Sequence, residues 1–254
     1  MNKRKICELL TRNFETEDFK EYFLDMCDHI PDYIFIMPSS TSGRYHNETQ
    51  CQPHGQLYHI FMFQSILESL LRLKGNKERF NTPEGRDTMR CVPAFHDAVK
   101  CGWNGSQYTV QNHPKLAAEW VMSTNVEHDI DPAWKRVIAD MCEAHSGEWN
   151  KDRSGNVIMS EPRNLREFFI HECDILASRN DLDWIISDEL KNIIKEEMPD
   201  PTVDEYEIPV GKYKGRKLVE IFAIDPDYCR WIRDNIDRQP LKSMLDELYE
   251  SNDN

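Results

Sequence analysis

Four histidines and two aspartates lie on predicted helices that are far apart in this sequence, so only a fold that brings those helices together can use them jointly. They are His59, His96, Asp97, His113, His145 and Asp174. Four imidazoles and two carboxylates form the ligand set that a pair of divalent metal ions requires from a protein. If the six converge, the sequence predicts a metal-dependent hydrolase or oxygenase; if they do not, it predicts an acidic helical protein with many histidines.

Apolar residues recur at helical spacing along most of the chain, which predicts a mainly α fold. The strongest pattern covers residues 56–74, carries His59 near its start and has Gly75 as a suitable residue after its end. Two loops, residues 38–55 and 146–163, separate predicted helices, and residues 38–56 and 146–163 are expected to form the walls of a pocket. Further helices are predicted within 5–28 and at 88–100, 113–124, 131–145, 163–179 and 183–197.

A Pro-Asp-Pro stretch marks a change in character near residue 200 and predicts a division into parts. Residues 1–37 are expected to be N-terminal helices that pack on the core. Residues 38–198 are expected to form a helical metal-binding domain, and residues 199–204 a linker. Residues 205–254 predict a small α+β appendage, with a glycine-containing hairpin followed by two helices at 217–223 and 225–236.

The net charge of −14 argues against broad electrostatic attraction to a nucleic-acid backbone. A nucleotide or a strand end held through metal ions remains compatible with that charge. The eight cysteines are spread singly without a CxxC pair, which disfavours a structural zinc site. With no signal segment and no run of about 18 apolar residues, we expect a cytoplasmic protein (host cytoplasm if viral) with no membrane contact.

Taken singly, each candidate ligand has an ordinary structural explanation. A histidine on an apolar helix, as His59 is, more often satisfies a hydrogen bond in the core. Histidine–aspartate pairs also occur by chance, as at His128-Asp129. Asp174 is the most informative single residue, because a carboxylate within an apolar helix is costly unless it is paired or bound to a metal.

Three further residues are candidates for contact with a substrate. Lys100 lies one helical turn after Asp97, where a cation can neutralise a substrate phosphate or remain solvated at a helix end. Ser178 and Arg179 lie one turn beyond Asp174. Both are candidates to touch a phosphate or a base, and an exposed helix end explains them equally well.

The order of these elements resembles that of the HD-domain metal phosphohydrolases, and most closely that of the bacterial HD-domain 3′→5′ exoribonucleases. The similar segments are Pro38 to His46, Gly55 to His59, His96 to Lys100, His113-Pro114, Ala144 to Trp149 and His171 to Ser178. Val99 stands where the family has a glycine. Residues 1–37 match no nucleic-acid-binding barrel.

The resemblance implies an HD-domain helical bundle with a binuclear metal site. Asp97 would bridge two divalent ions, and Mn, Fe or Ni would suit the mixed ligands better than Mg. One ion would also take His59, His96 and Asp174, and the other His113 and His145. A hydroxide held between the ions would attack phosphorus, with Lys100 neutralising charge and His46 contacting substrate.

The function expected from this resemblance is hydrolysis of a phosphoester or phosphodiester in a nucleotide, a cyclic nucleotide or a nucleic-acid end. Two alternatives remain open. Some members of the superfamily use the same six ligands for di-iron oxygenase chemistry. A cleft of this kind can also serve a non-catalytic protein that senses or binds a nucleotide.

The C-terminal segment has a second resemblance, carried by a Gly-Lys-Tyr-Lys-Gly turn and an Asp-Pro-x-Tyr-x-x-Trp motif starting at Asp225. It resembles the exodeoxyribonuclease X-like C-terminal module, which is appended to some exonucleases and phage proteins. Its basic turn could make weak contacts to nucleic acid or protein, or could be a solvated hairpin over a small core. The residues concerned are Lys212, Tyr213, Lys214, Arg216 and Lys217.

Overall fold

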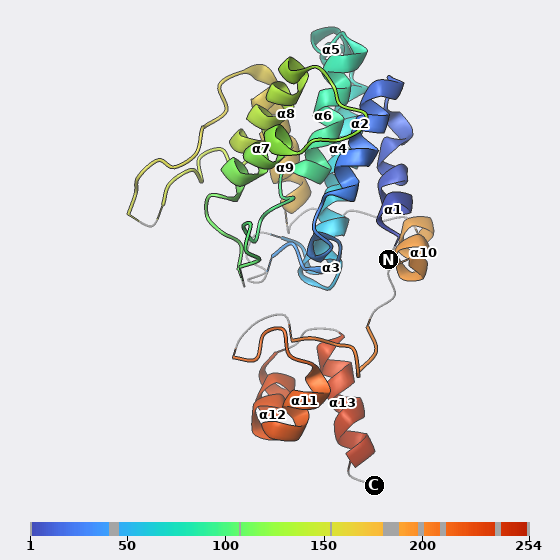
Figure 1. Cartoon of the computed structure of the whole chain (residues 1–254), viewed down its shortest axis with the longest axis vertical. Coiled ribbons are helices and arrows are strands. Elements are labelled where there is room, and N and C mark those ends of the chain that lie inside the picture. The colour runs from blue at the N-terminus through green and yellow to red at the C-terminus, as the bar shows by residue number, and fades with distance from the viewer. Residues whose placement is uncertain are drawn as a thin grey trace. The chain divides into compact units, whose positions relative to one another are not determined.

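Helices predominate in the computed structural model, as the apolar periodicity predicts (Figure 1). The structure describes residues 2–40, 46–106, 108–152, 154–179, 188–197, 201–208, 212–236 and 240–252. These residues contain no β-sheet, only two isolated antiparallel bridges, Lys151–Val157 and Glu207–Lys217. None of their helices is long and apolar enough to cross a membrane. The chain divides into two compact units, Met1–Lys191 and Asn192–Asn254.

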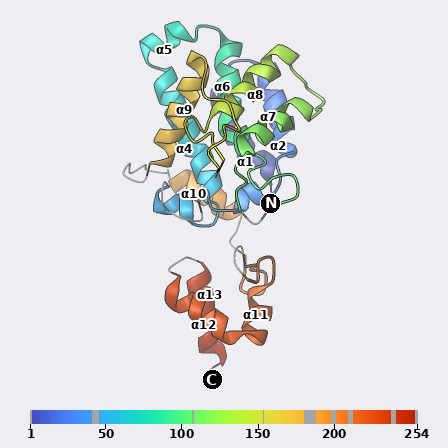
Figure 2. The ribbon, with the colours of Figure 1, turned by 90° about the vertical axis from the view of Figure 1, so that its left-hand side faces the viewer.

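The first unit is a bundle in which α4, α6, α8 and α9 lie side by side (Figures 1 and 2). Helix α4 packs on α6 and α9, while α8 packs on α6, α7 and α9. Proline occupies the first turn of α6, α7 and α8, where its missing N–H costs nothing. The helices are α1 (Lys3–Leu10), α2 (Glu17–Asp28), α3 (Tyr33–Ile36), α4 (Gly55–Leu71), α5 (Lys74–Arg79), α6 (Pro83–Phe95), α7 (His113–Ser123), α8 (Pro132–Ala144) and α9 (Leu165–Ser178).

Helix α4 is the centre of this bundle, because its own side chains, most of them apolar, are buried on most sides of the helix. Leu57, Phe63 and Leu67 are fully buried along it. Among them lie the buried polar residues Gln56 and His59, each near the start of the helix. A buried polar group needs a partner, so these two residues mark where the core opens onto a polar site.

A buried ion cluster ties the N-terminal helices to the bundle. The Asp87 carboxylate accepts hydrogen bonds from the backbone N–H groups of Glu15 and Thr16, next to the start of α2. Arg90 Nη1 donates to Glu15 at 2.7 Å and to Asp87 at 2.8 Å, and Arg90 Nε donates to Glu68 on α4 at 2.7 Å. These contacts fix α2, α4 and α6 relative to one another.

Helices α4 and α6 of the first unit differ from the sequence prediction. Helix α4 ends at Leu71, and Gly75 lies inside the short helix α5 instead of following α4. Helix α6 begins at Pro83, since the Thr82 side chain caps it by accepting from Gly85 N. It ends at Phe95, shortly after Pro93, whose ring removes one helical hydrogen bond. The predicted helix at 183–197 is described from Asp188 to Glu197 as α10, and residues 180–187 lie outside the described part.

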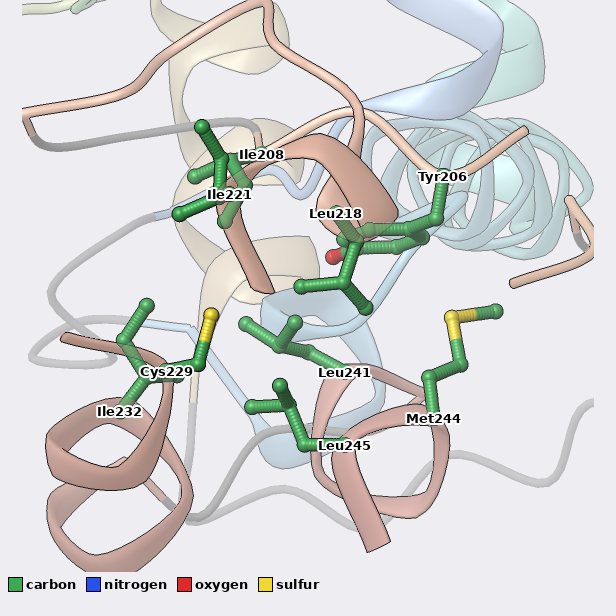
Figure 3. Packing of buried hydrophobic residues seen from close by; sticks show 9 residues of the cluster. All are labelled: Tyr206, Ile208, Leu218, Ile221, Cys229, Ile232, Leu241, Met244 and Leu245. Atoms are coloured by element: carbon green, nitrogen blue, oxygen red, sulfur yellow. The ribbon is translucent and has the colours of Figure 1, made fainter. Parts of the chain in front are cut away.

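The second unit has its own core, built from α11 (Leu218–Ile224), α12 (Pro226–Asn235) and α13 (Leu241–Asn252) (Figure 3). Helix α13 was not predicted from the sequence. The predicted hairpin is reduced to the Glu207–Lys217 bridge among the described residues, with Leu218 N donating to Tyr206 O. The core residues are Tyr206, Ile208, Leu218, Ile221, Cys229, Ile232, Leu241, Met244 and Leu245.

The boundary between the two units falls within α10, between Lys191 and Asn192. The sequence predicts the linker further along, at residues 199–204, of which residues 199 and 200 lie outside the described part. The division into N-terminal helices, metal-binding domain, linker and appendage therefore stays a prediction.

Candidate metal centre

A cavity of about 640 Å³ opens in the first unit. All ten side chains that the sequence singles out as ligands, catalytic groups or substrate contacts line it: His46, His59, His96, Asp97, Lys100, His113, His145, Asp174, Ser178 and Arg179. Ser39, Ser40, Thr109, Ser146, Trp149 and Ile175 complete its wall. The two loops expected to form pocket walls both contribute to this wall.

Helix ends deliver most of the candidate ligands to the cavity. His96 is the C-cap residue of α6, His145 is the C-cap residue of α8, and His113 is the first residue of α7. Side chains at helix ends are less constrained by neighbouring turns, and here they point into one space. His59 and Asp174 come instead from within α4 and α9, two helices that pack together.

The ligand atoms form two groups. In the first, His59 Nε2 lies 3.0 Å from Asp174 Oδ1 and 3.3 Å from His96 Nε2. In the second, Asp97 Oδ1 lies 3.0 Å from His113 Nε2 and 4.0 Å from His145 Nε2.

These separations match those of ligands around one ion. Two ligand atoms that each lie about 2.1 Å from an ion, at right angles to one another, are about 3 Å apart. The sets His59, His96, Asp174 and His96, Asp97, His145 each place their ligand atoms within 4.8 Å of one another.

Backbone carbonyls determine which nitrogen of three histidines faces the cavity. The Nδ1 atoms of His96, His113 and His145 lie 3.0, 2.9 and 2.7 Å from the carbonyl oxygens of Pro93, Val110 and Cys142. A carbonyl only accepts, so each Nδ1 carries the hydrogen and each neutral ring has a bare lone pair at Nε2. Ligand histidines in metalloproteins are oriented in this way.

Those lone pairs face carboxylate oxygens, which are also acceptors. No donor among the described residues satisfies Asp97 Oδ1, although His113 Nε2 lies 3.0 Å away. Burial lowers the pKa of His96 and lowers that of His145 to about 3, so protonated imidazoles do not resolve this repulsion at neutral pH. A divalent cation between the acceptors would resolve it, so the residues present fit a metal.

The other oxygen of Asp97 is held by protein donors. Oδ2 accepts from Lys100 Nζ at 2.8 Å and from Gln56 Nε2 at 3.1 Å. Lys100 also donates to Gln56 Oε1 at 2.7 Å and to the carbonyl of Ser39 at 3.1 Å, so all three donors of its ammonium group are used. Burial opposes ionisation of Asp97, but the Lys100 cation beside it helps to hold its pKa well below the usual range.

Lys100 therefore positions Asp97, and a direct role of Lys100 in neutralising a substrate stays a prediction. Gln56 was missed by sequence reasoning. The available signal was a polar side chain three residues before His59, on the same face of an apolar helix.

The candidate substrate contacts differ in how they are held. His46 Nδ1 lies 2.7 Å from Gln50 Oε1, and the Gln50 amide in turn donates to the Ala177 carbonyl at 2.8 Å. Burial lowers the pKa of His46 to about 4, so its ring is neutral. Ser178 Oγ donates to the Asp174 carbonyl at 3.0 Å, a contact that also explains it as a helix-end residue. Arg179 lines the cavity directly after α9.

The basic turn of the second unit is organised around one carboxylate. Lys212 Nζ and Tyr213 Oη donate to Asp225 Oδ2 at 2.9 and 2.7 Å, and the Lys212 ammonium lies 4.6 Å from the centre of the Tyr213 ring. Arg216 pairs with Glu220 at 3.5 Å. These contacts favour the structural explanation of the turn, and its contact with nucleic acid or protein stays a prediction.

Comparison with known proteins gives one match. The family model described as exodeoxyribonuclease X-like C-terminal matches residues 211–237, which confirms the resemblance of this segment. No curated protein and no solved structure matches the chain.

Proposed function

We propose that the first unit is an HD-type metal-dependent phosphohydrolase. It would cleave a phosphoester or phosphodiester in a nucleotide, a cyclic nucleotide or a nucleic-acid end. The observation that carries this proposal is the set of bare imidazole nitrogens, those of His96, His113 and His145, that face the Asp97 and Asp174 carboxylates inside one cavity. Such an acceptor cluster is stable around divalent cations and costly without them.

Counting lone pairs supports two ions that share Asp97. Each imidazole offers one nitrogen to the cavity and can bind one ion, whereas a carboxylate has two oxygens. His59, His96 and Asp174 would hold one ion, and His113 with His145 the other. When bound, the metals would polarise the phosphoryl oxygens and supply the nucleophile. The mixed nitrogen and oxygen ligands favour Mn²⁺, Fe²⁺ or Ni²⁺ over Mg²⁺.

The residues around the proposed ions would orient Asp97 and bind the substrate, whichever ions are present. Lys100 and Gln56 orient Asp97 through the hydrogen bonds at its Oδ2 atom. The cavity of about 640 Å³ lies within the range of pockets that take a nucleotide-sized ligand. Hydroxyl groups on its wall and Arg179 can bind phosphate oxygens.

The match of residues 211–237 supports a nucleic-acid-related substrate, because the module is named for an exodeoxyribonuclease. It gives no information on which bond the first unit cleaves. A strand end reaching a metal-loaded cavity is also compatible with a chain of net charge −14, since the ions would supply the local positive charge.

The test is a substrate screen on defined metal forms of the full chain. The protein is stripped with a chelator and reloaded separately with Mn²⁺, Fe²⁺, Ni²⁺ or Mg²⁺. It is then assayed on mononucleotides, cyclic nucleotides and short single strands, with Asp174→Asn as the inactive control. We expect release of phosphate or mononucleotide that depends on Mn²⁺, Fe²⁺ or Ni²⁺ and is lost in the variant.

Two results would contradict the proposal. One is a protein with two bound ions that turns over none of these compounds. The other is oxygen consumption by the iron-loaded protein together with an oxo-bridged di-iron spectrum, which would assign the same ligands to oxygenase chemistry.

A further inference from the structure

His145 is held at the end of α8 by two hydrogen bonds, one from its ring and one to its backbone. Its Nδ1 donates to the Cys142 carbonyl at 2.7 Å, which leaves Nε2 for the cavity. Its own carbonyl lies at a helix end, where carbonyls have no partner within the helix. His171 of α9 supplies that partner, because its Nδ1 donates to His145 O at 2.6 Å. A side chain of another helix therefore holds the backbone that carries a candidate metal ligand.

The turn directly after α8 leaves room for the buried ring of His171. Gly147 adopts φ +55° in this turn, and its N–H donates to Ala144 O at 3.0 Å. A Cβ atom at this position would overlap the His171 ring. Glycine permits both the left-handed backbone and the close approach of the ring, so the sequence of the turn is matched to His171.

The other contacts of the His171 ring are weaker than its bond to His145. His171 is not among the described residues that line the cavity, and it belongs to neither set of candidate ligands. Its Nε2 lies 3.4 Å from Glu148 Oε2, on a side chain that is 69 % exposed, and solvent screens such an ion pair. Its ring lies 6.3 Å from that of Trp149. The short bond to the His145 carbonyl is therefore the contact by which His171 acts on the site.

Helix α9 carries both His171 and Asp174, one turn apart on the same face. Asp174 Oδ1 lies 3.0 Å from His59 Nε2, in the first group of candidate ligands. His171 holds the backbone of His145, which belongs to the second group. One helix is therefore connected to both proposed ions, to the first directly through Asp174 and to the second indirectly through His171.

We propose that His171 is a positioning residue for the second ion, the one assigned to His113 and His145. It holds the His145 backbone where His145 Nε2, 4.0 Å from Asp97 Oδ1, can share an ion with that oxygen. This inference rests on the proposed function, since it needs the metal centre. Removing a residue that supports a metal ligand weakens metal binding about 10- to 100-fold.

The test measures Mn²⁺ affinity of the full chain by calorimetry in two backgrounds. His59→Gln leaves the second ion to be bound alone, and His113→Gln leaves the first. His171→Leu, His171→Asn and Glu148→Gln are placed in each background. Asparagine is the conservative variant, because its amide N–H takes the place of Nδ1–H and can still donate to the His145 carbonyl. Glu148→Gln is the matched control, since it removes the charge beside the other nitrogen of His171 and keeps the bond to His145.

In the His59→Gln background, we expect His171→Leu to weaken Mn²⁺ binding about 10- to 100-fold, while His171→Asn restores most of the affinity. Glu148→Gln, and every variant in the His113→Gln background, should stay within about twofold. Urea unfolding with chelator checks that each protein is folded, and His171→Gln replaces a leucine variant that is not. Unchanged affinity in the His59→Gln background, equal weakening in both backgrounds, or a loss that asparagine does not restore would each overturn the inference.

The proposed function is judged separately, by turnover in the substrate screen. Selective weakening of the second ion by His171→Leu, in a protein that hydrolyses no substrate, would support the positioning role and refute the hydrolase. Hydrolysis by wild type together with Mn²⁺ affinities that are indifferent to His171 would support the hydrolase and refute the positioning role. A wild type that binds no Mn²⁺ would refute both.

Discussion

Replacing Asp97 by asparagine separates the two tasks that its carboxylate has in the structure. Oδ2 accepts from Lys100 and Gln56, so the oxygen of the new amide must occupy that position. The amide nitrogen then takes the place of Oδ1 and can donate to the bare Nε2 of His113, 3.0 Å away in the wild type. Asp97→Asn therefore keeps the local hydrogen bonds while it removes a charge and a metal ligand.

Two contributions to the stability of the Asp97→Asn variant have opposite signs: a lost ion pair and a gained hydrogen bond. Lys100, which is 4 % exposed, loses its counter-ion, and breaking a buried ion pair costs about 3–5 kcal/mol. The new hydrogen bond to His113 offsets about 0.5–1.5 kcal/mol of this loss. The metal-free variant should thus be roughly 2–4 kcal/mol less stable than the metal-free wild type. In addition, wild type should gain about 2.7 kcal/mol for each of the two bound ions, about 5.4 kcal/mol together, when Mn²⁺ is present at about 100 times its dissociation constant, and the variant should gain none.

The assay is urea unfolding with chelator and with Mn²⁺, combined with a count of bound ions by elemental analysis. His59→Gln and His113→Gln are the controls, because each removes a ligand from only one of the two proposed sites and should leave about one ion. A full manganese increment in Asp97→Asn would show that Asp97 is not a ligand. If Asp97→Asn lowers the free energy of unfolding of the metal-free protein by less than about 1 kcal/mol, the buried Lys100 does not need Asp97 as its counter-ion.

Two further predictions concern the buried ion cluster. Arg90→Met should lower the free energy of unfolding, measured in urea, by about 3–5 kcal/mol, because Glu68 and Asp87 lose the cation that they share. Adding Glu68→Gln to Arg90→Met should recover part of the lost stability, since one of the unpaired charges is removed. Losses that simply add in the double variant would show that Arg90 and Glu68 are not energetically coupled. Hydrogen bonding from Arg86 lowers the pKa of Glu15 from 4.5 to about 2. The stability that Glu15 contributes should be complete above pH 4.5 and be lost as the pH falls toward 2, and Glu15→Gln should flatten this part of the stability curve. An unchanged curve for that variant would refute the assignment.

Local signals were sufficient to predict most of the helices. The apolar pattern of α4 and the prolines that open α7 and α8 act over one or two turns, so the sequence around them carries the information. Where two local signals compete, the prediction was wrong. Gly75 was expected to follow α4, but the helix had already ended at Leu71. The cap formed by Thr82 extends α6 five residues further toward the N-terminus than its apolar pattern.

Long-range contacts decided the details of the candidate site. The hydrogen bonds of Lys100 to Ser39 and Gln56, and of His171 to His145, join segments that no local pattern relates. For this reason the sequence left Lys100 as either a cation facing substrate or a solvated helix-end residue. In the structure Lys100 is buried and its ammonium group donates to Asp97, Gln56 and Ser39, and its contact with substrate stays a prediction.

The two histidine–aspartate pairs of the chain show most directly what the sequence determines and what the tertiary structure decides. By sequence alone, His96-Asp97 and His128-Asp129 are the same dipeptide, and only the order of the surrounding elements distinguished the first. In the structure His96 is 1 % exposed and faces Asp174, while His128 is exposed and pairs with Asp25 at 2.9 Å. The sequence by itself determined the residue types and the helices that carry them. Only the tertiary structure decided which of these histidine and aspartate side chains are buried and which of them lie close together, because burial and convergence depend on how the helices pack.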